Sequence, residues 1–158
     1  MSEVVRAPVT AYIALGANLG DARATVLQAI EGIAALRLTT LVRRSSLYRT
    51  APVQSTGPDY INAVVEVTTG LGPQELLLEL QQLEQAAGRE RPHRNAPRTL
   101  DLDILRYGDA CVDSPTLVIP HPRMMARAFV LVPLAEIAPH AVTLAQLQAV
   151  ESQSIERL

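Results

Sequence analysis

The order of hydrophobic patterns along the chain constrains its fold more than any other feature. Two segments with helical periodicity, one following Asp21 and one running from Pro73 to Gly88, lie between segments that have the pattern of strands. The expected strands are residues 11–15, 39–48, 60–68 and 99–107. The order strand, helix, strand, strand, helix, strand is the split β-α-β arrangement. It predicts an α+β fold, a ferredoxin-like sandwich in which helices pack on one face of an antiparallel sheet.

The strand at 60–68 shows the clearest alternation. Ile61, Ala63, Val65 and Val67 should point to one face, whereas Tyr60, Asn62, Val64 and Glu66 should point to the other. The last 50 or so residues are expected to form a short strand at 116–120, a helical segment around 123–137 broken by Pro133, and a terminal helix. We expect one domain over residues 1–158, with 1–9 as a flexible lead and 140–158 as a C-terminal extension.

Composition and charge limit the cellular compartment of the protein and the classes of partner that it can bind. A net charge of −2 provides no broad basic field for nucleic acid, and one cysteine, Cys111, permits no internal disulfide. No apolar run approaches the roughly 18 residues of a membrane span, and residues 1–21 do not resemble a signal peptide. We therefore expect a soluble cytoplasmic protein without a nucleic-acid or membrane partner.

Asp101 and Asp103 are the strongest candidates for metal ligands. They are two residues apart on the expected strand 99–107, so both carboxylates should share one face. At about 3.3 Å per residue, their Cα atoms stand roughly 6–7 Å apart. This spacing suits one shared hard cation or a pair of them. A solvated strand face explains two acids equally well, so the Asp-x-Asp motif alone leaves both interpretations open.

The segment directly before this strand favours the metal interpretation. It contains Arg89, Arg91, Arg94 and Arg98 within ten residues. Guanidinium groups bind phosphate oxygens in a bidentate manner, so arginines beside two aspartates suit a Mg²⁺-bound polyphosphate. The prolines and Asn95 in this segment predict a non-helical loop that can close over a substrate.

Two further sets of residues have weaker patterns. Tyr60 and Asn62 share one face and could bind a flat heterocycle, although this pair is also commonplace at a strand start. The glycines of residues 16–20 (GANLG) lack the lysine and the spacing of a Walker motif and the full dinucleotide fingerprint. We therefore assign no phosphate loop there.

Longer blocks of the sequence carry a specific resemblance. In order, they are AYIALGANLGD, SSLYRTAPV, PDYINAVVEV, LLLELQQLEQAAGRERPHRNAPRTLDLDIL and PHPRMMARAFVLVPLAEIAP. Over about residues 11–139 the chain resembles 6-hydroxymethyl-7,8-dihydropterin pyrophosphokinase of folate biosynthesis. The resemblance implies transfer of the β,γ-pyrophosphoryl group of ATP to the hydroxymethyl oxygen of the pterin, with two Mg²⁺ ions, leaving AMP.

The resemblance also implies a role for each residue that matches the family's motifs. Asp101 and Asp103 match the metal ligands, and Arg89 and Arg98 match arginines that stabilise the transferred phosphates. The matches to ATP contacts are Glu84, Arg91, Ile104, His121 and Arg127. The matches to pterin contacts are Thr50, Pro52, Val53, Tyr60, Asn62 and Phe129, with Tyr60 and Phe129 as the two rings that sandwich the pterin.

Some positions depart from the family pattern. The family's Thr-Pro-Pro is here Thr50-Ala51-Pro52, Asn95 stands near a tryptophan of some members, and Pro122 and Val118 replace an aromatic and a hydroxyl residue. These changes concern loop closure and adenosine contacts rather than the reaction.

Two alternative functions are weighed against this one. A Mg²⁺-dependent nucleotidyltransferase also uses strand-borne aspartates, but it would release pyrophosphate instead of AMP. An RNA-binding ferredoxin-like module is disfavoured by an aromatic content of only 3%. We expect ATP and the pterin as the partners, and a monomer.

Overall fold

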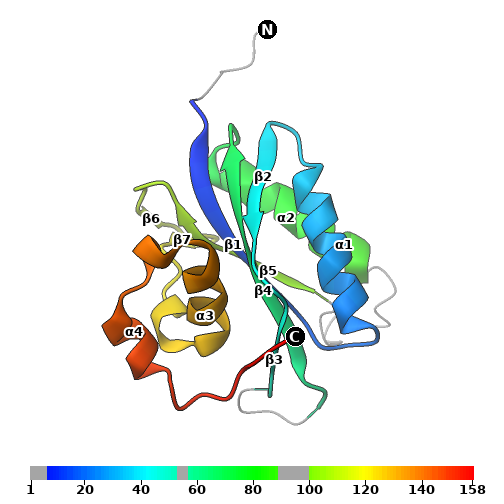
Figure 1. The fold of residues 1–158 in the computed structure, drawn as a ribbon. Helices are drawn as coiled ribbons and strands as arrows, with labels where there is room; N and C mark the ends of the chain where they lie inside the picture. Colours follow the sequence, from blue (N-terminus) through cyan, green and yellow to red (C-terminus); the bar gives the residue numbers. More distant parts are fainter. Residues whose placement is uncertain (1–6, 53–56, 89–99) are drawn as a thin grey trace, which may run out of the picture.

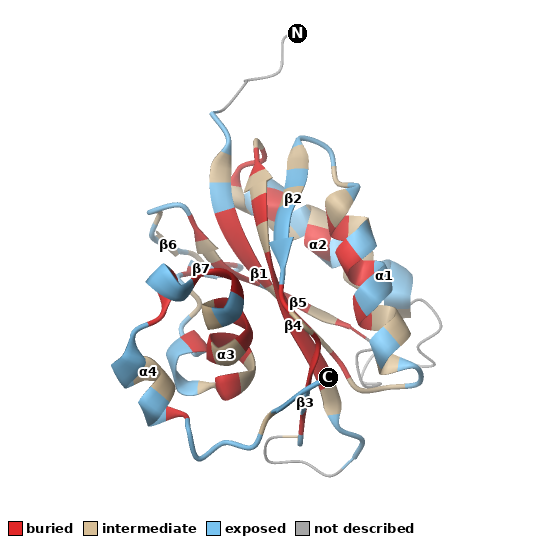
Figure 2. Ribbon diagram, in the orientation of Figure 1, coloured by how far each residue is buried: buried red, intermediate tan, exposed pale blue. Residues whose placement is uncertain are grey.

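The computed structural model describes residues 7–52, 57–88 and 100–158, and its centre is an antiparallel sheet. The strands follow the order β5-β1-β4-β3-β8. Strands β2 and β3 pair with opposite ends of the same edge of β4. Their bounds are β1 Val9–Ala17, β2 Thr39–Arg44, β3 Tyr48–Thr50, β4 Tyr60–Thr69, β5 Asp101–Tyr107 and β8 Glu156–Arg157. The two central strands, β1 and β4, are mostly buried (Figure 2).

Helices α1 (Ala22–Ala34) and α2 (Pro73–Gly88) lie on one face of this sheet, as predicted (Figure 1). The Asp21 carboxylate caps α1 by accepting a hydrogen bond from the Ala24 N–H at 3.1 Å, which confirms the expected start of the helix. The core on this face contains Ile61, Ala63, Val65 and Val67, as the alternation predicted.

The other face of the sheet carries a second core, built with helix α3 (Ala128–Ile137). Val64 of β4 and Leu105 of β5 pack there against Leu131 and Leu134 of α3. The expectation of helices on one face therefore holds for α1 and α2, and α3 adds a helix on the opposite face (Figure 1).

The expected strand 39–48 is two strands in the structure. Ser45 interrupts it: its N–H donates to the Val64 carbonyl at 2.9 Å, and its hydroxyl accepts from the Val64 N–H at 2.9 Å. A side chain thus replaces one backbone partner of β4, so β2 ends before Ser45 and β3 starts at Tyr48.

The C-terminal third contains short elements around α3. They are β6 Val112–Asp113, β7 Val118–Ile119, the 3-10 turns η1 Met124–Ala126 and η2 Pro139–Ala141, and α4 Leu144–Ala149. The expected helical segment around 123–137 is interrupted at Arg127, which is extended, and α3 continues through Pro133. The predicted break at Pro133 is therefore wrong; Pro133 is buried, and its neighbour Leu134 belongs to the second core.

A bulge in β5 changes which residues face the two cores. Ile13 of β1 pairs with Ile104, but its neighbour Tyr12 pairs with Arg106, so Leu105 is the extra residue. Asp101, Asp103 and Leu105 therefore share the α3 face, while Tyr107 returns to the face of α1 and α2. Within the described ranges, no helix is long and apolar enough to cross a membrane.

Candidate active site

A cavity of about 400 Å³ lies where the ends of β1, β3, β4 and β5 meet the segment that leads into α3. Its lining contains eight of the residues that the sequence singled out: Thr50, Tyr60, Asn62, Asp101, Asp103, His121, Arg127 and Phe129. These residues come from four separate parts of the chain, and the sheet register and the chain path after β7 bring them together.

The acidic wall of the cavity comes from the first residues of β5. Asp103 is exposed and Asp101 is partly buried, and both line the cavity from the same face of the strand. The intervening Leu102 is buried in the opposite core. The predicted placement of the two carboxylates on one face is therefore confirmed.

His121 faces this acidic wall from the turn after β7. Its Nε2 atom lies 3.9 Å from Asp103 Oδ1, and its Nδ1 atom accepts a hydrogen bond from the Arg123 N–H at 3.2 Å. Because Nδ1 acts as an acceptor, the proton of the neutral ring belongs on Nε2, on the side of Asp103. The His121 N–H also donates to the Leu105 carbonyl at 3.0 Å, which ties the turn to the edge of β5.

Gly16 forms the floor of the cavity between the acidic wall and β4. It pairs with Asp101 on one side and with Asn62 on the other. A Cβ atom at this position would stand 3.2 Å from Asn62 Oδ1 and 4.0 Å from the Tyr60 ring. The missing side chain therefore keeps the space between Asp101 and Asn62 open.

The polar wall opposite is made by Asn62 and Thr50. Asn62 is only 3% exposed, and its Nδ2 donates to Thr50 Oγ1 at 2.7 Å. This bond fixes the carboxamide orientation and leaves Oδ1 towards the floor at Gly16. Thr50 and Asn62, which both match pterin contacts of the family that the sequence resembles, thus support each other.

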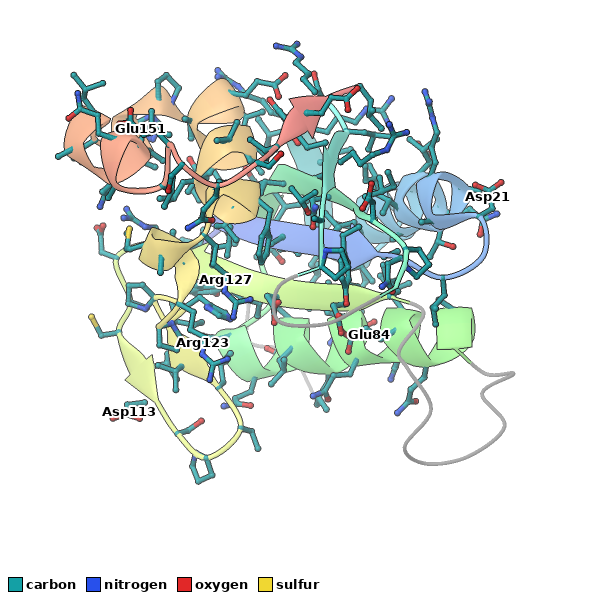
Figure 3. The ribbon with its side chains drawn as sticks, turned by 90° about the horizontal axis from the view of Figure 1, so that it is seen from below. Asp21, Glu84, Asp113, Arg123, Arg127 and Glu151 are labelled. Atoms are coloured by element: carbon teal, nitrogen blue, oxygen red, sulfur yellow. The ribbon has the colours of Figure 1, made fainter. Side chains whose placement is uncertain are left out.

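The third wall comes from η1 and the start of α3. Arg123 and Arg127 both line the cavity, and both lie on the segment between β7 and α3 (Figure 3). The Arg127 guanidinium carbon stands 5.3 Å from the centre of the Phe129 ring, within cation–π range. The cavity therefore has carboxylates at one wall and guanidinium groups at another, an arrangement that suits a metal-bound polyanion.

Not all predicted residues reach this cavity. Glu84 lies on α2, apart from Arg123 and Arg127 (Figure 3), and accepts a hydrogen bond from the Leu102 N–H at 2.8 Å. Ile104 is buried in the core on the α1 and α2 face. Pro52 follows the cavity residue Ala51 but does not itself line the cavity. Arg89, Arg91, Arg98 and Val53 lie outside the described residues, as does the predicted loop 89–98.

Two of the cavity residues that the sequence did not single out, Gly16 and Arg123, bear on its chemistry. Gly16 belongs to residues 16–20, which were rejected as a phosphate loop. The expected strand ended at residue 15, whereas β1 extends to Ala17, and a glycine inside a strand is a signal of close approach. Arg123 stands two residues after His121, but one exposed arginine near a turn has no distinctive pattern, so only the structure identifies it.

A polar cluster behind the cavity holds β3 in place. Glu136 of α3 accepts hydrogen bonds from the Tyr48 hydroxyl at 2.7 Å, the Ser46 N–H at 2.9 Å and the Ser46 hydroxyl at 2.8 Å. Arg157 of β8 lies 3.4 Å from the same carboxylate. The cluster connects α3, β3 and β8, and β3 ends at the cavity residue Thr50.

The pKa values of this cluster are shifted in opposite directions. Burial raises the pKa of Tyr48 to about 12, and the hydrogen bond to the Glu136 carboxylate adds to the shift. Burial alone would raise the pKa of Glu136, but the hydrogen bonds from Tyr48 and Ser46 and the charge of Arg157 lower it overall. At neutral pH the pair is therefore a neutral phenol donating to a carboxylate.

The sequence of this chain is similar to sequences of known proteins. A sequence model of the 7,8-dihydro-6-hydroxymethylpterin-pyrophosphokinase family matches residues 12–139. A relative from Haemophilus influenzae, a 2-amino-4-hydroxy-6-hydroxymethyldihydropteridine pyrophosphokinase, is 47% identical over 135 residues, which cover 85% of this chain and 84% of the relative. A Bacillus subtilis protein of the same name is 44% identical over 128 residues, covering 80% of this chain and 77% of the relative.

Solved structures support the fold independently of close sequence similarity. A Plasmodium falciparum HPPK-DHPS triple mutant crystallised with STZ-DHP superposes with a TM-score of 0.69 at 14% identity, over 87% of this chain. The wild-type protein from the same organism gives a TM-score of 0.64 at 14% identity, over 84% of this chain. This chain spans only about two fifths of the length of those proteins, 41% and 38% respectively. The family match covers most of the chain, and the relatives are matched over most of their length, so the chain belongs to the 7,8-dihydro-6-hydroxymethylpterin-pyrophosphokinase family.

Proposed function

We propose that the cavity described above is where this pyrophosphokinase transfers the β,γ-pyrophosphoryl group of ATP to the hydroxymethyl oxygen of 6-hydroxymethyl-7,8-dihydropterin. The hydroxymethyl oxygen of the pterin loses its proton and forms a bond to the β-phosphorus. The bond between the β-phosphorus and the α,β-bridging oxygen breaks, and that oxygen leaves as part of AMP. The products are AMP and the pterin pyrophosphate. The observation that carries the proposal is one cavity with Asp101 and Asp103 on one wall and Asn62 and Phe129 on others.

The donor set at the acidic wall fits Mg²⁺. Mg²⁺ is usually held by one or two carboxylates together with substrate phosphates and water, rather than by an all-protein cage. Among the described residues no group of three or more His, Cys, Asp or Glu side chains forms a metal site, and Asp101 and Asp103 supply the two carboxylates that this mode requires. When bound, the two expected ions would neutralise phosphate charge and polarise the bond that breaks.

The chain's own residues bind and orient the two substrates. Arg127, on the third wall of the cavity, supplies a positive charge to the triphosphate, and Arg123 is placed to do the same. His121 Nε2–H, held by its Nδ1 bond to the Arg123 backbone, points towards the acidic wall and can donate to a phosphate oxygen there. Arg89 and Arg98 take the role that the family resemblance implies, stabilising the phosphates in transit.

The polar wall orients the pterin. Tyr60 and Phe129 provide two ring faces for a flat heterocycle, and the Asn62 carboxamide provides a donor and an acceptor for its edge. Because Gly16 leaves open the space between Asn62 and Asp101, the hydroxymethyl group can approach the metal-bound phosphate without obstruction. Binding both substrates in one cavity converts the reaction into an effectively intramolecular step.

The experiment that tests this proposal measures AMP by chromatography with ATP, Mg²⁺ and the reduced pterin present. The wild type should form AMP only when all three are supplied. Asp103→Asn should lower the rate by about 100-fold or more, because the loss of several kcal/mol of metal-dependent stabilisation has that effect.

The matched control is Asp113→Asn, which removes an exposed carboxylate from β6, away from the cavity. It should leave the rate within about twofold of the wild type, as surface substitutions usually do. Release of pyrophosphate from ATP instead of AMP would identify a nucleotidyltransferase and overturn the proposal. Equal activity of Asp103→Asn and the wild type would overturn the assignment of the metal site.

A further inference from the structure

The C-terminal segment 150–158 crosses the molecule beside the active-site cavity, although the family match ends at residue 139. It leaves α4, passes the start of α3, and ends in β8, which pairs with β3. The Leu158 N–H donates to the Leu47 carbonyl at 2.9 Å, which extends this pairing by one residue. The segment thus joins two walls of the cavity: the start of α3 and the strand that carries Thr50 (Figure 1).

The side chain of Gln153 makes two hydrogen bonds to the backbone on either side of Arg127. Its Oε1 accepts from the Ala128 N–H at 2.8 Å, and its Nε2 donates to the Ala126 carbonyl at 2.8 Å. The carboxamide pairs with this short stretch in the way that a neighbouring β-strand would. Arg127, between the two bonds, is extended with φ −131° and ψ 120°.

These bonds satisfy groups that the local sequence leaves without partners. The Ala128 N–H is at the first position of α3, where N–H groups have no partner within the helix. Arg127 is the N-cap residue of α3, and its side chain makes no capping hydrogen bond. Gln153 therefore supplies from a distant part of the chain what a serine or aspartate cap supplies elsewhere.

The geometry at Arg127 links these bonds to substrate binding. The Arg127 side chain leaves the backbone between the two bonded groups, lines the active-site cavity and stands 5.3 Å from the Phe129 ring centre. A second cavity of about 450 Å³ continues past Arg127 and Phe129, and Gln153 and Ser154 form part of its wall. A change in the backbone angles at Arg127 would therefore move the guanidinium group relative to the acidic wall.

We propose that Gln153 is a positioning residue for Arg127, and that the C-terminal segment thereby sets the strength of ATP binding. The proposal rests on the role given to Arg127 above, as a contact of the triphosphate. Gln153 itself does not line the cavity that holds the reacting groups, and it acts through the backbone of residues 126–128.

The test compares Gln153→Met with the wild type. Methionine has nearly the same length and volume, but it has no donor for the Ala126 carbonyl and only a weakly accepting sulfur for the Ala128 N–H. Binding of α,β-methylene ATP with Mg²⁺ is measured by calorimetry at a temperature at which thermal unfolding shows each variant to be folded. We expect Kd for this analogue to rise about tenfold, while kcat at saturating ATP stays within about threefold of the wild type.

Two further variants separate positioning from simple stabilisation. Gln148→Met makes the same change at an exposed glutamine of α4 and should leave Kd unchanged. In an Arg127→Ala background, Gln153→Met should change Kd by less than about twofold, because the residue through which Gln153 acts is gone.

Three results would overturn the proposal. The first is an unchanged Kd in Gln153→Met with only a lower Tm, which is what a purely structural cap would give. The second is a tenfold loss that persists in the Arg127→Ala background. The third is an Arg127→Ala variant that binds the analogue as well as the wild type does; this would refute the role of Arg127 itself, and with it the role of Gln153, while AMP formation by the wild type would still stand.

Discussion

Replacing Asn62 by alanine should weaken pterin binding far more than ATP binding. Asn62 is only 3% exposed, and its carboxamide is held by a 2.7 Å hydrogen bond to Thr50. The carboxamide is therefore already oriented when the ligand binds. Loss of its hydrogen bonds to the pterin edge should cost about 2 kcal/mol, because groups on the ligand are left unpaired in a desolvated site. That cost corresponds to roughly a 30-fold rise in Kd for the pterin.

The assay is calorimetric titration of the pterin with α,β-methylene ATP and Mg²⁺ already bound. The control is Thr50→Val, which removes the hydroxyl that holds the carboxamide but leaves the carboxamide itself, so its effect on Kd should be clearly smaller. Binding of the ATP analogue alone should be unchanged in both variants. The assignment of Asn62 to the pterin fails if Asn62→Ala binds the pterin within about twofold of the wild type while turnover falls.

Three other perturbations test separate parts of the account. Arg98→Ala should lower turnover much more than it weakens pterin binding, because the charge that it stabilises develops on phosphate; steady-state kinetics with calorimetry would contradict this by giving equal losses in both. Gly16→Ala should raise Kd for the pterin at a cost of about 1–3 kcal/mol, because its Cβ would stand 3.2 Å from Asn62 Oδ1 on the cavity floor; unchanged binding would show that the floor does not contact the ligand. Tyr48→Phe should lower the free energy of unfolding by about 1.5 kcal/mol at neutral pH, through loss of a hydrogen bond to a carboxylate. Because the folded pKa of Tyr48 is raised from 10.0 to about 12, this stabilisation is complete below pH 10 and is lost as the pH rises towards 12. Urea unfolding at pH 7 and 11 should therefore give a smaller difference between Tyr48→Phe and the wild type at pH 11, and equal differences would contradict the assigned pKa.

The parts of the fold that follow from local patterns could be predicted from the sequence. Alternation in residues 60–68 identified both faces of β4, and Asp21 marked the start of α1 because its carboxylate can cap the first turn. The same alternation placed Asp101 and Asp103 on one face of β5. Each of these features depends on residues within a few positions of one another.

The features that local patterns did not predict depend on contacts between distant residues. Ser45 ends β2 because its side chain bonds to Val64 of β4, and Leu105 is bulged because the register with β1 shifts there. Helix α3 continues through Pro133, and its apolar residues are buried against the second face of the sheet. No short-range periodicity reports such pairings.

The candidate site divides in the same way. The sequence could identify eight of the lining residues because they belong to specific motifs. Arg123 and Gly16 belong to no such motif; the turn after β7 brings Arg123 to the cavity, and the register of β1 brings Gly16 there. Gln153 was not singled out because its partners, Ala126 and Ala128, are bound through backbone groups that leave no trace in the sequence.

The central claim is that the β- and γ-phosphates of ATP move together to the pterin. ATP labelled with ³²P at the β-phosphate tests it most directly, with Mg²⁺, the reduced hydroxymethyl-pterin and separation of products by chromatography. The account predicts that the label appears in the pterin pyrophosphate while unlabelled AMP forms in equal amount. Label that remains in ADP would indicate transfer of the γ-phosphate alone, and label released as pyrophosphate would indicate nucleotidyl transfer; either result would contradict the account.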